Sequence, residues 1–98
     1  MGLFGNGSNK FEVQTVGAIP DGYQSVGLVM GFKMIYKISI VNEKNLRNAT
    51  QAALDDLASN LKAVNADGYA NLKINQVSAG QDNVDLGVTV YADAIKRI

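Results

Sequence analysis

The sequence predicts an α+β fold of two layers, in which a four-stranded, mainly antiparallel sheet packs on one amphipathic helix in the order ββαββ. Two observations predict it. Four stretches alternate apolar and polar residues, which is the period of a half-buried strand. Between the second and third stretches the apolar residues recur every three or four positions, which is typical of a helix with one buried face. With 98 residues in all, we expect residues 11–98 to form a single domain.

Residues 1–10 differ in composition from the rest of the chain. They hold three glycines and only two apolar residues after the initial methionine, Leu3 and Phe4. Such a composition predicts a flexible N-terminal segment. It also lacks the apolar run of a secretory signal, so we expect a cytoplasmic protein.

The first two strands are predicted on either side of a turn at Pro20-Asp21-Gly22. The first runs from Phe11 to Thr15, and the short connection favours antiparallel pairing with the second. Every even position of the second stretch is apolar, and this face is expected to pack against the helix: Val26, Leu28, Met30, Phe32, Met34, Tyr36, Ile38 and Ile40. Gly27 and Gly31 are candidate positions for a bulge or bend.

The helix is predicted from about Glu43 to Val64. Asn42 precedes it as an N-cap, and Asn65 tolerates the left-handed backbone that commonly ends a helix. One side carries the apolar repeat Leu46, Ala49, Ala53, Leu57, Leu61 and Val64. We expect this side to cover the apolar face of the sheet.

The last two strands are predicted as a hairpin with its turn at 81–83. Ala70, Leu72 and Ile74 alternate with polar residues in the third strand. The fourth strand places one apolar face toward the helix: Val84, Leu86, Val88, Val90, Ala92 and Ala94.

The sheet face away from the helix is then expected to mix charged and apolar residues. The charged members are Lys33, Lys37, Lys73, Asp85 and Asp93, and the apolar ones are Val29, Ile35, Val77, Tyr91 and Ile95. One interpretation is a solvated face with cross-strand pairs such as Lys73 with Asp85. The other is a subunit interface or a channel between subunits, in which Lys33, Lys37, Lys73 and Tyr91 would bind an anionic small molecule.

Composition excludes several classes of site. The chain has no His, Cys or Trp, which excludes a Ser-His-Asp triad, a cysteine nucleophile, a disulfide and any zinc site of His and Cys. Nine basic and nine acidic residues give zero formal net charge, without the field of a nucleic-acid binder. Pro20 and Asp21 interrupt the longest apolar stretch, so no membrane span is expected. We therefore predict a protein that is not an enzyme and has no metal site, cofactor, nucleic-acid partner or membrane partner.

Several stretches resemble the YbjQ-like heavy-metal-binding domain family. The segment from Asn65 to Ile74 is similar to the family's helix-to-strand junction, and Val88 to Lys96 to its closing strand. Gly27-Leu28-Val29-Met30-Gly31 lies where members carry a Gly-Val-Val-x-Gly stretch. The resemblance implies a small ββαββ subunit that assembles into a homo-oligomeric ring, commonly a pentamer, with no established enzymatic activity. Soft metals prefer thiolate or imidazole ligands, which this chain lacks, so no metal-ligand residues carry over.

The strand Tyr36 to Val41, followed by an alanine-rich helix and two strands, also resembles dodecins. That resemblance implies an alternative function, a small-ligand binding or storage oligomer for a flavin-like or anionic molecule. Dodecins usually stack flavin on Trp, and in this chain Tyr69 or Tyr91 would have to take that role.

Overall fold

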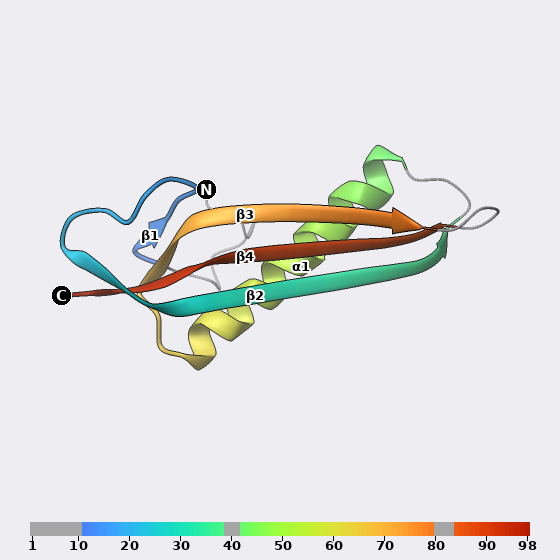
Figure 1. The fold of residues 1–98 in the computed structure, drawn as a ribbon. Helices are drawn as coiled ribbons and strands as arrows, with labels where there is room; N and C mark the ends of the chain where they lie inside the picture. The colour runs from blue at the N-terminus through green and yellow to red at the C-terminus, as the bar shows by residue number, and fades with distance from the viewer. Residues whose placement is uncertain (1–10, 39–41, 80–83) are drawn as a thin grey trace.

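The computed structural model describes residues 11–38, 42–79 and 84–98. Its elements follow the predicted ββαββ order: β1 (Val13–Gln14), β2 (Tyr23–Ile38), α1 (Glu43–Ala63), β3 (Gly68–Ala79) and β4 (Val84–Arg97). The four strands form one sheet, and α1 crosses one side of it diagonally (Figure 1). The predicted α+β architecture of two layers is confirmed. The predictions for residues 1–10, for Ile40 and for the turn at 81–83 lie outside the described residues.

The sheet has the strand order β1-β3-β4-β2, and β4 pairs antiparallel with both β2 and β3. The prediction of a first hairpin is wrong, because β1 is only two residues long and pairs in parallel with β3. The turn before Tyr23 is present, since the Tyr23 N–H donates to the Pro20 carbonyl over 3.3 Å. However, the segment between β1 and this turn carries the chain from one edge of the sheet to the other. Gly68 permits the parallel contact, because a Cβ there would lie 2.2 Å from the Val13 carbonyl oxygen.

The helix forms within one residue of the predicted bounds. The Asn42 side chain accepts a hydrogen bond of 2.9 Å from the Asn45 N–H, and Asn65 has the left-handed φ of 57°. The residues of α1 that are buried include four of the predicted apolar repeat: Ala49, Ala53, Leu54, Leu57, Ala58 and Leu61. They pack on the even positions of β4 from Leu86 to Ala94, as predicted.

Tyr69, at the start of β3, is the largest fully buried side chain among the described residues. Burial raises the pKa of its phenol to about 12, because the phenolate would lose its hydration inside the protein. Tyr69 is therefore neutral at ordinary pH. It belongs to the core beneath α1 and does not offer the exposed ring that a stacked ligand would need.

The two ends of the described chain meet in a polar cluster. Arg97, at the end of β4, forms an ion pair with Glu12, and its N–H donates to the Asp67 carboxylate over 2.8 Å. A side-chain hydrogen bond with Tyr23 and the charge of Glu12 raise the pKa of Arg97. The cluster connects the segment before β1 to the starts of β2 and β3.

The prediction for the faces of β2 is wrong. Val29 and Ile35, which are odd positions, pack against the core beneath α1. The even positions from Leu28 to Met34 point the other way, and Leu28, Met30 and Phe32 are exposed. The more apolar face of β2 is therefore the one that the helix does not cover.

Gly31 explains why the odd face receives the helix. A Cβ at this position would lie 2.2 Å from the Ala53 carbonyl oxygen and 2.4 Å from the Leu57 nitrogen, so the helix backbone rests directly on β2. The pairing with β4 continues through Gly31 without a shift. The predicted bulge is instead at Gly27, where the register shifts and φ is 134°.

Replacing Gly31 with alanine should separate α1 from the sheet. The new methyl group would overlap backbone atoms that cannot rotate away, so we expect the free energy of unfolding to fall by about 2 kcal/mol or more. Urea denaturation followed by circular dichroism measures the change. Gly17→Ala is the control, because its Cβ would meet only the Thr15 hydroxyl at 3.4 Å. Equal stability of the two variants would contradict the close packing of α1 on β2.

Candidate functional site

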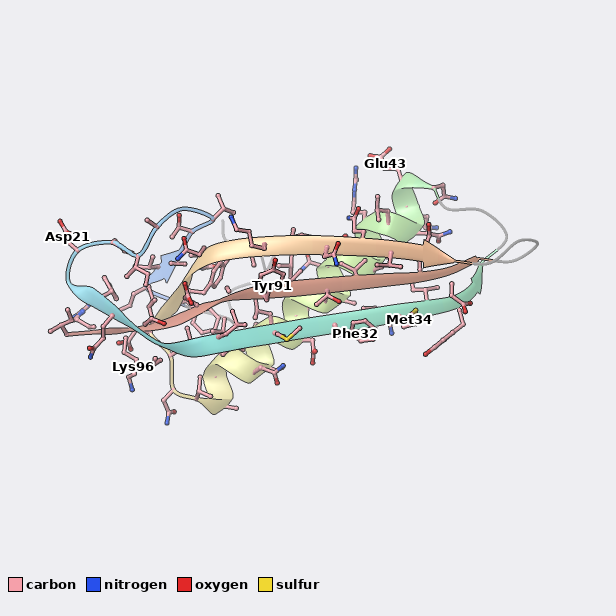
Figure 2. The ribbon with its side chains drawn as sticks, in the orientation of Figure 1. Asp21, Phe32, Met34, Glu43, Tyr91 and Lys96 are labelled. Carbon is pink, nitrogen blue, oxygen red and sulfur yellow. The ribbon has the colours of Figure 1, made fainter. Side chains whose placement is uncertain are left out.

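The surface that stands out is the side of the sheet turned away from α1, here called the open face. The pairing register defines it, because residues opposite one another on neighbouring strands share a face. Three rows cross β2, β4 and β3 in that order: Met30, Tyr91 and Lys73; Phe32, Thr89 and Asn75; Met34, Gly87 and Val77. Figure 2 labels Phe32 and Met34 on β2 and Tyr91 on β4, with the helix behind the sheet.

The open face is largely apolar and exposed. Exposed fractions are 64% for Leu28, 51% for Phe32 and 60% for Val77. Met30 and Tyr91 are also exposed, so all three long strands contribute. Single exposed apolar residues are normal on a protein, whereas a contiguous group of this kind marks an interaction surface.

Gly87 shapes the middle of the open face. Gly87 is buried although it belongs to the open face, because the Met34 and Phe32 side chains lie over it. A Cβ on Gly87 would be 3.2 Å from the Met34 methyl carbon and 3.8 Å from a ring carbon of Phe32. The missing side chain lets two large apolar groups of β2 reach across β4. The apolar residues of β2 therefore continue over Gly87 on β4 toward Val77 on β3.

The structure brings together only two of the four predicted ligand residues. Lys73 and Tyr91 lie directly opposite each other on the open face. Lys33 is paired with Val88 and therefore belongs to the face that carries the helix. The Lys37 side chain lies outside the described residues.

Other predicted members of this face are also placed differently. Val29 and Ile35 pack against the core, and Ile95 is buried. The pair of Lys73 with Asp85 is wrong, because Asp85 lies opposite Ala79 at the far end of β3. The pairing runs without a shift from Ala79 and Asp85 back to Lys73, so Lys73 lies opposite Tyr91, six residues further along β4 than Asp85. Asp93 instead accepts a hydrogen bond of 2.8 Å from the Asn71 side chain.

The helix supplies polar groups to the outer edge of β2. The Phe32 N–H donates to the Asp56 carboxylate over 2.9 Å, and the Asn60 side-chain amide donates to the Met30 carbonyl over 2.7 Å. These backbone groups point away from β4 and would otherwise be available to another strand. The sequence analysis did not assign a role to either residue. The signal lies in their spacing of four, which places both on one side of α1.

The described residues do not form a metal site or a pocket. Among residues 11–38, 42–79 and 84–98, no three acidic side chains gather where they could hold a metal ion. No pocket opens on the surface of this part of the chain. The helix of the described chain is not apolar enough over a sufficient length to cross a membrane. The arrangement is suited to contact over a broad surface.

Comparison with known proteins identifies the fold but does not assign the chain to a family. No family model matches the sequence, and no curated protein matches it. A solved structure that does match is a protein of unknown function from Pediococcus pentosaceus that belongs to the DUF74 family. The TM-score is 0.73 and the identity 18%, over 88% of this chain and 97% of that chain. At this identity the likeness establishes a shared fold.

Asp56→Ala tests whether the helix protects the edge of β2. Loss of the carboxylate should cost about 1 kcal/mol of stability. It should also accelerate hydrogen exchange of the Phe32 amide, measured residue by residue with NMR. The matched control is Asp55→Ala, because Asp55 accepts its hydrogen bond from Gln51 on the helix itself. The protective role is refuted if Phe32 exchanges at the same rate in both variants.

Proposed function

We propose that this protein is a non-enzymatic homo-oligomer in which neighbouring copies bury the open face. The observation that supports this proposal most strongly is the orientation of β2. Its more apolar side, with Leu28, Met30 and Phe32, faces away from the only helix of the described chain. A monomer would leave these side chains in water.

The energetics favour a partner that covers the whole surface. Burying apolar surface contributes about 25 cal/mol per Å². Association costs about 4–15 kcal/mol in lost rotational and translational freedom, so a few contacts are not enough. The open face extends over three strands and offers aromatic, methionine and aliphatic side chains, which are enriched in interface cores. The charged residues that the register places on this face, Lys73, Asp85 and Asp93, lie on β3 and β4 and not on the apolar row of β2.

A closed ring, commonly a pentamer, is the assembly that the sequence resemblance to YbjQ-like domains suggests. The fold shared with a DUF74 protein supports a subunit of the same architecture. A closed ring leaves no copy with an unpaired interface, because every copy makes the same two contacts with its neighbours.

Light scattering of the purified protein tests this assembly. A ring of five gives about five times the chain mass of 10.4 kDa, and stacked rings a multiple of that value. Phe32→Lys should lower the particle mass, because a charge cannot be buried in the contact without a partner. Val16→Lys is the control, since Val16 is 65% exposed but lies outside the sheet. A wild-type monomer, or a Phe32→Lys variant of unchanged mass, would contradict the proposal.

The row that contains Lys73 and Tyr91 favours a second candidate function, the binding of a flat anionic molecule such as a flavin. Tyr91 presents a partly exposed ring, and Lys73 lies opposite it on β3. Freshly purified protein would then carry visible absorbance, and Tyr91→Ala would reduce it relative to Tyr36→Ala. A colourless protein that does not take up added flavin would exclude the flavin form of this candidate.

A further inference from the structure

The two edges of the sheet differ in how their backbone groups are satisfied. On β2, the helix side chains Asp56 and Asn60 occupy outward groups at the centre of the strand. On β3, the first part of the edge is covered, because the Thr15 N–H donates to the Tyr69 carbonyl over 3.2 Å. Among the described residues, Asn71 is the last position of β3 with such a partner, through its N–H and the Gly17 carbonyl at 2.8 Å. Beyond it, no other described strand pairs with the outer edge of residues 72–78.

The register shows which backbone groups of β3 point outward. The backbone N–H and C=O groups of Met30 and Phe32 point away from β4, toward the side chains of the helix. The residues opposite them on β4 are Tyr91 and Thr89, and the backbone groups of these two residues therefore point away from β2, toward β3. This follows because opposite residues of an antiparallel pair either exchange both hydrogen bonds or neither.

The same alternation extends to β3. Lys73 and Asn75 lie opposite Tyr91 and Thr89, so their backbone groups bond to β4. The N–H and C=O of Ile74 and Gln76 therefore point away from the sheet. These two residues are exposed, with Ile74 at 47%.

The side chains of this edge do little to prevent another strand from pairing. Natural edge strands are usually protected by several charges, a proline or a bulge. Residues 72–78 contain no proline and a single charge, Lys73. The bulge lies at the start of this segment, between Ala70 and Lys73, and leaves residues 73–78 regular. The segment therefore combines unpaired backbone groups with low charge.

We propose that this edge pairs with the β3 edge of a second copy, in antiparallel orientation about a two-fold axis, to give one continuous sheet. A second copy offers two sheet edges, and its β2 edge is obstructed by Asp56 and Asn60. If the two-fold axis passes near Asn75, Lys73 of each copy lies opposite the uncharged Val77 of the other copy. The two Lys73 side chains are then not directly opposed. The inference rests on the proposed self-association and deepens it by naming a contact separate from the open face.

Gln76→Pro is the decisive variant. Proline removes only the outward N–H of residue 76, so the pairing of β3 with β4 is retained while the contact between copies is lost. A two-fold contact joins copies in pairs, so the wild-type copy number should be even and the variant should have half the particle mass by native mass spectrometry. Asn75→Pro is the matched control, because it removes an N–H that bonds to β4 and should unfold the sheet.

A second variant covers the case in which Gln76→Pro fails to fold. Ile74→Lys keeps every backbone group and adds a like charge to both copies of the edge, so it should also halve the mass. Val64→Lys, at an apolar residue 48% exposed beyond the helix, should leave the mass unchanged. An odd wild-type copy number, or a folded edge variant of wild-type mass, overturns the β3 contact. The open-face contact is tested separately by Phe32→Lys. An unchanged particle mass of that variant would refute the open-face contact and leave the β3 contact untouched.

Discussion

The contact between the helix backbone and Gly31 decides how the rest of the molecule is arranged. Because no side chain separates them, α1 lies close enough to β2 for Asp56 and Asn60 to reach its backbone groups. The same contact fixes which face of β2 is covered. The helix therefore protects one edge of the sheet and leaves the opposite apolar face exposed.

Local patterns were sufficient for most of the secondary structure. The helix begins after Asn42 and ends before Asn65, because capping depends on residues next to one another in the chain. The faces of β4 were predicted because only one of them is apolar. The first hairpin was not, because strand pairing depends on distant residues, here the approach of Val13 to Gly68.

The open face was predicted only in part, for a physical reason. In β2 both faces carry apolar residues, so alternation indicates a strand but does not say which face packs on the helix. The prediction assigned the helix to the more apolar side, which assumes that a chain buries its own apolar residues. In the structure the face that packs on the helix is instead the one that contains Gly31, where the helix backbone can approach closely. Lys33 and Lys73 were consequently placed on one face, whereas the structure separates them.

The helix also limits how copies can associate, because it crosses the sheet diagonally and reaches the centre of β2 (Figure 1). Because side chains of α1 already bond to outward backbone groups of β2, these groups cannot pair with a strand of another copy. Within the described part of the chain, nothing protects the β3 edge in this way after Asn71, since the helix packs mainly on β2 and β4. A sheet with one protected edge cannot extend indefinitely through its edges, because two copies joined at β3 present only β2 edges outward. The same side chains that stabilise the subunit would then also stop edge pairing at two copies, leaving further growth to the open face.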